Sequence, residues 1–147
     1  MINIYNEIFK EYQQFMFNNS NYIDDIKRIV KVYTNTSSKF PIISCQLSNF
    51  IDTDYCTVDK VEKYEEMYLT IDIYTQNKTV DNEIIASQEI NDELTELTIK
   101  FFENKGMKKT LCRPTPNADK DITRRTIQYQ GLASPYRKNI IRRWFYV

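Results

Sequence analysis

The sequence predicts an α+β fold, a single mainly antiparallel sheet of about four to five strands covered by an N-terminal helix and a long central helix. Two stretches in the middle of the chain indicate this fold. In residues 64–74, apolar and polar residues alternate with the two-residue period of a strand that buries one face. In residues 81–106, apolar residues recur every three or four positions, as in a helix with one buried stripe, at Ala86, Ile90, Leu94, Leu97 and Phe101. A helix of about 20 residues is roughly 30 Å long, so it can cover the sheet of a small domain.

The first third of the chain predicts one helix and two shorter elements. Residues 2–17 predict a helix whose apolar stripe consists of Ile4, Ile8, Tyr12, Phe15 and Met16. Residues 22–33 fit a short helix or a strand, and we expect a helical turn that runs into a strand. Residues 40–50 predict a strand in which Ile43, Cys45 and Leu47 share a face, with Pro41 at its start, where a missing N–H donor is tolerated. We expect residues 51–63 to form an acidic, mobile connection.

After the strand at 64–74, the second half predicts the long helix and further strands. Asp81 can cap the start of the helix, and Gly106 suits the left-handed residue that ends it. Residues 107–113 alternate as a strand, with Lys109 and Leu111 on the same side. Two prolines in residues 113–117 then prevent regular pairing. We expect residues 122–130 to resume a strand with Ile127 and Tyr129 facing inward, and residues 140–147 to form a terminal strand.

Length and composition indicate one domain, residues 1–147, because no stretch rich in Pro, Gly or Ser divides the chain. Apolar residues make up 41% of the chain, enough for a core. No apolar run approaches the ~18 residues of a membrane span, and the N-terminus lacks the pattern of a signal peptide. Cys45, Cys56 and Cys112 form no CxxC pair, which favours reduced thiols. We therefore expect a cytosolic protein with no membrane partner.

The composition argues against an enzyme. Histidine is absent, which removes the usual general base of serine and cysteine hydrolases and the commonest zinc ligand. Two glycines in total cannot provide a P-loop or a dinucleotide-binding loop. Residues 52–63 begin like a calcium loop but end on Lys63, where glutamate is needed. Glu103 and Lys105 have the spacing of a metal-dependent nuclease that Asp72 could complete, but a solvated helix end explains them better. We expect no catalytic residue, metal or cofactor.

The formal net charge is zero, but the charges are unevenly distributed. Residues 1–50 carry five basic and four acidic residues, residues 51–104 carry four and fourteen, and residues 105–147 carry eleven and two. The net charges of these segments are therefore +1, −10 and +9. Such blocks fit solvated faces that neutralise each other within one fold. They also fit a molecule with an acidic side and a basic side, which favours head-to-tail contact between copies.

Two tandem arginine pairs, Arg124-Arg125 and Arg142-Arg143, lie in predicted strands. Adjacent strand residues point to opposite faces, so each pair should place one guanidinium on either side of the sheet. Three interpretations remain open. The arginine stems could cover aromatic rings at the rim, the guanidinium groups could pair with the acidic segment of a neighbouring subunit, or they could contact DNA phosphates.

Five characteristic segments follow the predicted N-terminal helix. In order along the chain, they are FPIISCQLSNF, EMYLTIDIYTQN, FFENKGM, RPTPNADKDITRRTIQYQGL and IIRRWFYV. This succession resembles the small tail-terminator, or tail-completion, proteins of tailed bacteriophages and of phage-tail-like bacteriocins. The resemblance extends from about residue 40 to residue 147, whereas residues 18–39 match little. No catalytic signature belongs to it.

The resemblance implies a structural ring protein. Six copies would close into a ring on the last ring of the tail tube, stop its polymerisation and offer their other face to the connector or collar. The implied partners are further copies of the chain, the tail tube protein, and the sheath and connector or collar proteins; DNA would pass through the ring without specific binding. The implied location is the host bacterial cytoplasm during assembly and then the head-proximal end of the tail.

By position, we expect the acidic and the basic segments to lie at contacts between subunits or rings. The candidate interface residues are Asp52, Asp54, Asp59, Glu62, Glu65, Glu66, Arg124, Arg125, Arg137, Arg142 and Arg143. Exposed Tyr and Phe side chains from loops should anchor these contacts. Two alternatives remain, a nucleic-acid-binding or processing module, indicated by the basic C-terminal third, and another neck or head-closure protein of the same particle.

Overall fold

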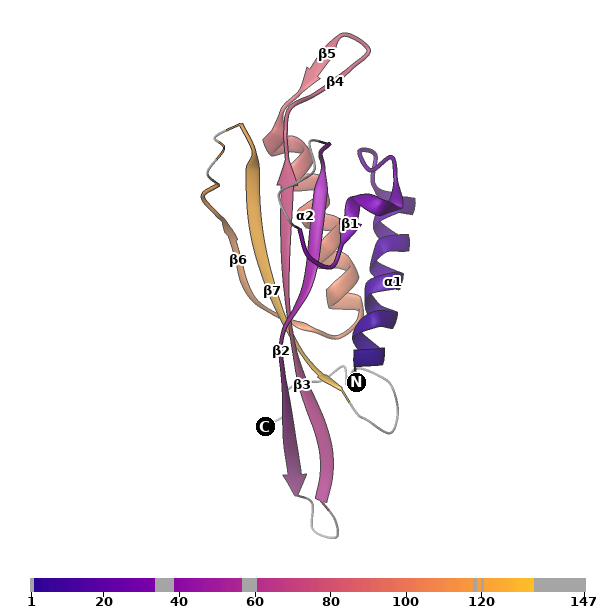
Figure 1. The fold of residues 1–147 in the computed structure, drawn as a ribbon, viewed down its shortest axis with the longest axis vertical. Coiled ribbons are helices and arrows are strands. Elements are labelled where there is room, and N and C mark those ends of the chain that lie inside the picture. Colours follow the sequence, from indigo (N-terminus) through magenta and orange to yellow (C-terminus); the bar gives the residue numbers. More distant parts are fainter. Residues whose placement is uncertain (1, 34–38, 57–60, 118, 120, 134–147) are drawn as a thin grey trace.

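The protein is an α+β structure with two helices and a mainly antiparallel five-stranded sheet (Figure 1). The computed structural model describes residues 2–33, 39–56, 61–117, 119 and 121–133, and of residues 2, 3, 49–56, 61–65 and 133 the backbone alone. The elements are α1 (Ile2–Asn19), the 3₁₀ turn η1 (Ile26–Arg28), β1 (Ile29–Val30), β2 (Ile42–Cys56), β3 (Val61–Thr75), β4 (Lys78–Val80), β5 (Glu83–Ile85), α2 (Ser87–Asn104), β6 (Lys108–Pro114) and β7 (Thr123–Ala133).

The strand order of the main sheet is β1-β2-β3-β7-β6. Only β1 runs parallel to its neighbour, and the other pairs are antiparallel. A separate hairpin, β4–β5, projects from one end of the molecule, and the far halves of β2 and β3 extend past the helices at the other end (Figure 1). The long axis of the molecule therefore ends in two different hairpins.

The core lies between the two helices and one face of the sheet. Met67, Leu69, Ile71 and Ile73 of β3 are all buried, which confirms the alternation expected from the sequence. The predicted inward residues Ile127 and Tyr129 are also fully buried.

The helix α1 contributes the stripe expected from the sequence, because Ile4, Ile8, Tyr12 and Met16 are buried in the core and Phe15 packs at its margin. The predicted helical turn and strand within residues 22–33 are η1 and β1.

The predicted start of the long helix at Asp81 is wrong. Asp81 and Asn82 have φ angles of 52° and 65° and form the two-residue turn between β4 and β5, a conformation that Asp and Asn tolerate better than most residues. The helix begins at Ser87, whose backbone N–H donates to Asn77 Oδ1 at 2.8 Å. The side chain of Asn77, which precedes the hairpin, thus takes the place of Asp81, the expected cap. Ala86, which was expected on the buried stripe, is exposed. The predicted end of the helix is confirmed, because Gly106 has a φ of 81°.

Residues 51–63 do not form the expected connection. β2 continues to Cys56 and β3 begins at Val61, so most of this stretch belongs to one long hairpin. Its register places Asp52 opposite Glu65 and Asp54 opposite Lys63. The ladder of backbone hydrogen bonds continues through this charged stretch, because it requires only that the two backbones stay side by side.

The predicted alternation in residues 107–113 is also wrong. A register shift between Lys109 and Leu111 leaves Lys109 opposite the buried Tyr129 and Leu111 opposite the exposed Gln128. Lys109 and Leu111 therefore lie on opposite faces of β6, as expected of a β-bulge. Regular pairing extends to Pro114, which is opposite Arg125, so the break expected from residue 113 begins after Pro114. The predicted strand 140–147 lies outside the described residues.

The core contains ionisable groups that are stable only in their neutral form. The Tyr5 hydroxyl donates to the Cys45 carbonyl at 2.7 Å, and the Tyr12 and Thr98 hydroxyls are hydrogen-bonded at 2.7 Å. Burial raises the pKa of the Cys45 thiol to about 12. Burial, reinforced by the nearby Cys45, raises the pKa of Tyr5 to about 12, and burial also raises the pKa values of Tyr12 and Tyr129.

We expect the protein to lose stability at alkaline pH. In the unfolded chain these groups release protons near pH 9 for Cys and pH 10 for Tyr, whereas in the folded chain they stay protonated to about pH 12. The free energy of unfolding should therefore be steady below pH 9 and fall as the pH rises from 9 to 12. Urea unfolding followed by circular dichroism at pH 8, 10 and 11 measures this fall. Equal stability at pH 8 and pH 11 would contradict the burial of these groups.

Candidate interaction surface

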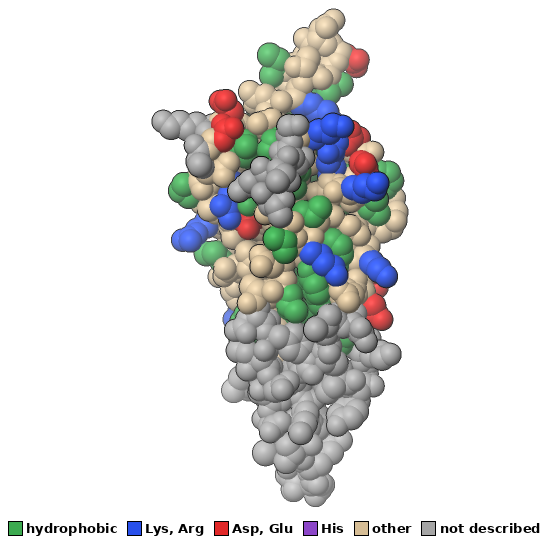
Figure 2. All heavy atoms as spheres, in the orientation of Figure 1, with side chains coloured by type: hydrophobic (Ala, Val, Ile, Leu, Met, Phe, Trp, Pro, Cys, Tyr) green, Lys and Arg blue, Asp and Glu red, His purple; other side chains and the backbone are tan. Residues whose placement is uncertain are grey.

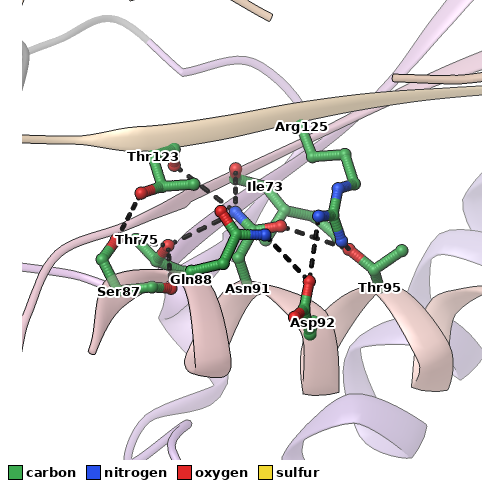
Figure 3. A network of polar contacts seen from close by, with 9 residues as sticks. All are labelled: Ile73, Thr75, Ser87, Gln88, Asn91, Asp92, Thr95, Thr123 and Arg125. Atoms are coloured by element: carbon green, nitrogen blue, oxygen red, sulfur yellow. Dashed lines mark hydrogen bonds and ion pairs between the residues drawn. The ribbon is translucent and has the colours of Figure 1, made fainter. Parts of the chain in front are cut away.

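Arg125 belongs to a polar network between the start of α2 and the strands β3 and β7 (Figure 3). Its Nη1 donates to Thr95 Oγ1 at 3.0 Å, and its Nη2 forms an ion pair with Asp92 Oδ1 at 2.9 Å. Thr95 in turn donates to Asn91 Oδ1 at 3.2 Å. The guanidinium of Arg125 therefore faces the helix side of the sheet and is held by α2.

Asn91 is the centre of this network. Its side chain is fully buried, and its Nδ2 lies 3.0 Å from the Ile73 carbonyl oxygen and 3.3 Å from Thr75 Oγ1. Thr75 Oγ1 is also hydrogen-bonded to Ser87 Oγ at 2.9 Å, and Ser87 Oγ donates to Thr123 Oγ1 at 2.7 Å. The network satisfies buried polar groups at the ends of β3 and β7, so it fixes where α2 lies on the sheet.

Arg124 lies on the other face of the sheet. Its Nε donates to Asp72 Oδ1 at 3.1 Å, and its guanidinium carbon lies 5.3 Å from the centre of the Tyr74 ring. Thr126 also donates to Asp72 Oδ1. The prediction that Arg124 and Arg125 lie on opposite sides of the sheet is confirmed. Both arginines pair with carboxylates of their own chain, and Arg124 also covers an aromatic ring.

The sequence alone predicts that charge reversal at Arg124 and Arg125 leaves the monomer folded and impairs assembly, whereas this pairing predicts that reversal at Arg124 destabilises the chain itself. The side chain of Asp72 is only 13% exposed, so Arg124→Glu would place two carboxylates together in a poorly solvated position. We expect the variant to lose about 2 kcal/mol of unfolding free energy, measured by urea unfolding.

Two further variants control for this prediction. The exposed Arg113 lies on β6 opposite Thr126, and Arg113→Glu should change stability by less than about 0.5 kcal/mol. Asp72→Asn, added to Arg124→Glu, should recover part of the loss because it removes the repulsion. Equal stability of the two arginine variants would count against the Arg124–Asp72 pair.

The candidate acidic residues lie mostly on the far half of the β2–β3 hairpin. We use the name acidic stretch for residues 51–56 and 61–66, which contain Asp52, Asp54, Glu62, Glu65 and Glu66 with one basic residue, Lys63. Glu66 is half-buried, and its Oε2 accepts a hydrogen bond from the Tyr68 hydroxyl at 2.9 Å. Asp59, Arg137, Arg142 and Arg143 lie outside the described residues.

The acidic stretch and the arginine pair lie at opposite ends of the sheet. Arg124 is opposite Tyr74 near one end of β3, and Glu66 is opposite Leu132 toward the other. At about 3.3 Å per residue, Glu66 and Tyr74 are roughly 26 Å apart along the strand. Among the described residues, the structure therefore does not bring Arg124 and Arg125 together with the acidic stretch within one chain.

A second basic region, which sequence reasoning missed, surrounds a pocket of about 380 Å³ beside the β4–β5 hairpin. Arg28, Lys39 and Lys78 line it together with Asp24. These residues come from distant parts of the chain, so no sequence spacing could have indicated the pocket. Figure 2 shows Lys and Arg side chains close together just below the projecting hairpin.

Large apolar side chains are exposed at a few positions of the described chain. They are Phe17, Val32, Val80 and Ile84, and only one of them is aromatic. Ile84, which is 74% exposed, and Val80, which is 40% exposed, both lie on the β4–β5 hairpin. Within the described residues, two of the four exposed large apolar side chains therefore lie on this hairpin.

Other kinds of site find no support in the described part of the chain. The described residues include no group of three or more Cys, Asp or Glu side chains that could hold a metal ion. None of the described helices combines the length and the apolar character needed to cross a membrane. No protein-family model matches the chain, and a search of curated proteins finds no significant match.

Proposed function

We propose that this chain is a structural ring protein of the tail-terminator type, which caps the end of the tail tube of a phage or phage-tail-like particle. The proposal rests on the order of sequence segments that resembles this family. One structural observation supports it most, namely that the acidic stretch lies on a hairpin that extends past the helices (Figure 1). A hairpin in this position can reach a neighbouring subunit without disturbing the core of its own.

The proposed mechanism consists of binding alone. A tube subunit exposes a surface that recruits the next ring, and the terminator covers that surface and presents a different one, so that growth stops. The exposed Val80 and Ile84 on the projecting β4–β5 hairpin suit such a contact, because apolar side chains near the centre of an interface contribute much of its binding energy. The other face of the ring would then bind the connector or collar.

A head-to-tail arrangement of subunits fits the shape and the charges of the chain. The two ends of the long axis carry different hairpins, and the acidic stretch lies at one end only. Contacts between unlike surfaces generate closed rings when the rotation between neighbours closes, and six copies are proposed here by resemblance to the family.

The alternative of a nucleic-acid-binding module has less support among the described residues. Arg124 and Arg125, which were candidates for phosphate contact, pair with Asp72 and Asp92 of the same chain. DNA binding of this kind should weaken steeply with salt, since each phosphate contact releases counterions. Failure to bind single-stranded or duplex DNA at low salt would exclude it. The other alternative, a neck or head-closure protein, predicts binding to the connector without any effect on the tube.

Native mass spectrometry of the chain with its tube protein tests the proposal. We expect the chain to form a closed ring, and a complex of one such ring with tube rings. A chain that stays monomeric at all concentrations and never binds the tube protein would contradict the proposal.

A further inference from the structure

The outer edges of β5 and β6 have no partner strand among the described residues. β6 is the last strand of the main sheet, so within the described chain only one of its edges is paired, with β7. β5 belongs to a two-stranded sheet, so within the same residues only its edge toward β4 is paired. The backbone N–H and C=O groups on the outer edge of a strand can pair with a strand of another chain.

On β6, the backbone groups of Cys112 point to the outer edge. The Thr115 N–H donates to the Arg124 carbonyl oxygen at 2.9 Å, so these two residues form a hydrogen-bonded pair that continues the register of β6 and β7. Hydrogen-bonded and non-hydrogen-bonded pairs alternate along an antiparallel ladder. Cys112, three positions before Thr115, is therefore in a non-hydrogen-bonded pair with Ile127, and its N–H and C=O face outward.

The part of this edge that allows regular pairing is short. The register shift between Lys109 and Leu111 places a bulge at Thr110, which interrupts the edge on one side. Pro114, which has no N–H to donate, interrupts it on the other side. The run between these two interruptions is residues 111–113, so the edge suits a strand of three residues.

On β5, the backbone groups of Ile84 point to the outer edge. The turn at 81–82 has two residues with positive φ angles, so Val80 and Glu83 form the hydrogen-bonded pair that closes the hairpin. The next pair, Thr79 with Ile84, is then non-hydrogen-bonded, and the N–H and C=O of Ile84 face outward. β5 is three residues long, which matches the length of the run on β6.

We propose that β5 of one copy pairs antiparallel with residues 111–113 of β6 in a second copy, so that the hairpin adds two strands to the sheet of its neighbour. The inference rests on the proposed ring function, because it names a surface through which neighbouring subunits meet. It assigns Ile84 to this contact. Val80, which lies on the opposite face of the hairpin, stays available for the tube.

The outward backbone groups fix the register of the pairing. With Ile84 opposite Cys112, each residue donates its N–H to the carbonyl oxygen of the other, as in any hydrogen-bonded antiparallel pair. Both positions are accessible, since Cys112 is exposed and Ile84 is 74% exposed. The two edges differ, so the contact is head-to-tail and can repeat around a ring.

The same register gives complementary side chains on both sides of this central pair. It places Glu83 opposite Arg113, and both of these side chains are exposed. It places Ile85 opposite Leu111, which are two half-buried apolar side chains. Opposite charges and apolar side chains are the kinds of cross-strand pair that stabilise antiparallel sheets.

The partner strand must come from another copy, because the hairpin lies away from this part of β6 within one chain. Cys112 is opposite Ile127, and Ile127 is opposite Ile71 on β3. At about 3.3 Å per residue, Ile71 is roughly 13 Å from Thr75, where β3 ends. The hairpin begins beyond Thr75 and projects away from the sheet (Figure 1).

Disulfide cross-linking of the full-length chain tests the pairing. The test chain carries Ile84→Cys, and Cys56→Ser removes another thiol; Cys112 is the native partner, and Cys45 is buried. Opposite residues of a hydrogen-bonded pair have Cα atoms about 5.5 Å apart, within the range of a disulfide. After mild oxidation with copper phenanthroline, we expect a ladder of covalent oligomers beyond the dimer on a non-reducing gel, because each copy offers one β5 and one β6.

Two control chains identify the contact. Cys112→Ser in the test chain should abolish the ladder and leave at most dimers joined through the introduced thiols. Val80→Cys in place of Ile84→Cys moves the thiol to the other strand of the hairpin, about 10 Å from the β6 edge of the neighbour. We expect at least about tenfold less cross-linking from that chain, since a disulfide does not span this distance.

Charge reversal tests the register of the side chains. Glu83→Arg and Arg113→Glu should each weaken self-association, measured by sedimentation, at least about threefold, because like charges then lie opposite each other. A chain with both substitutions should associate within about twofold of wild type. The matched control is Lys109→Glu, an exposed position beyond the bulge, which should change association less than about twofold.

The outcomes separate this contact from the ring function. If wild type forms rings but the Ile84→Cys and Val80→Cys chains cross-link equally, the pairing is wrong while the ring function stands. Cross-linking of the test chain that stops at dimers would also overturn the pairing. If wild type does not associate at all, the ring function and the contact both fail.

Discussion

Replacement of Phe102 with Ala should lower the free energy of unfolding by about 4 kcal/mol. Phe102 is fully buried, and its ring joins three parts of the fold. Its centroid lies 5.0 Å from that of Tyr12 on α1 and 4.8 Å from that of Tyr129 on β7. Truncation to Ala removes these contacts and leaves a cavity that the sheet and two helices cannot close without moving apart.

The control for this prediction is Phe17→Ala, an identical truncation on α1. Phe17 is 39% exposed, so its loss should cost less than about 1 kcal/mol. Urea unfolding of both variants measures the difference. Similar losses at the two positions would show that Phe102 is not the centre of the core.

Replacement of Asn91 with Leu should lower the free energy of unfolding by about 3 kcal/mol. Leu is close in volume but cannot donate to the Ile73 carbonyl oxygen or to Thr75 Oγ1, and it cannot accept from Thr95. These partners are buried, and a buried polar group without a partner costs about 1–3 kcal/mol. The apolar gain of Leu offsets only part of this loss.

Gln88→Leu is the matched control for Asn91→Leu, one helical turn earlier on α2. Gln88 is exposed, and its Nε2 donates to Asp92 Oδ1 at 3.0 Å on the surface. We expect a change of less than about 0.5 kcal/mol, measured by the same urea unfolding. If Asn91→Leu were as stable as wild type, the network in Figure 3 would contribute nothing to stability.

Hydrophobic periodicity predicted the parts of the fold in which one face is buried. The stripe of α1 and the alternation of β3 both face the core, so their spacing is imposed by burial. The same reasoning failed at residues 81–85. There the predicted helix included residues 81–85 because Asp81 was expected to cap it, but these residues belong to a projecting hairpin, and Ile84 is exposed. The positive φ angles of Asp81 and Asn82 mark the turn, but Asp is also a common helix cap, so sequence alone allowed both.

The far half of the β2–β3 hairpin could not be predicted for a different reason. Residues 51–56 and 61–66 extend past the helices, and six of these twelve residues are charged. A stretch this rich in charged residues is typical of a loop. The strands continue because each backbone completes its hydrogen bonds with the other.

The predicted interface residues were chosen by charge and position along the chain, and charge alone cannot show which carboxylate a basic residue meets. The partner of Arg124 is Asp72, which depends on the register of β3 and β7. The pocket depends on the approach of Arg28, Lys39 and Lys78 from three separate segments. Both features are products of the tertiary fold and leave no local signal.

The length distribution of tail tubes tests the proposed function most directly. Tube protein allowed to polymerise alone and with the chain would be compared by electron microscopy at equal tube-protein concentrations. We expect short tubes that stop growing and carry extra ring density at one end when the chain is present. Tubes of unchanged length with bare ends, even at excess chain, would contradict the account.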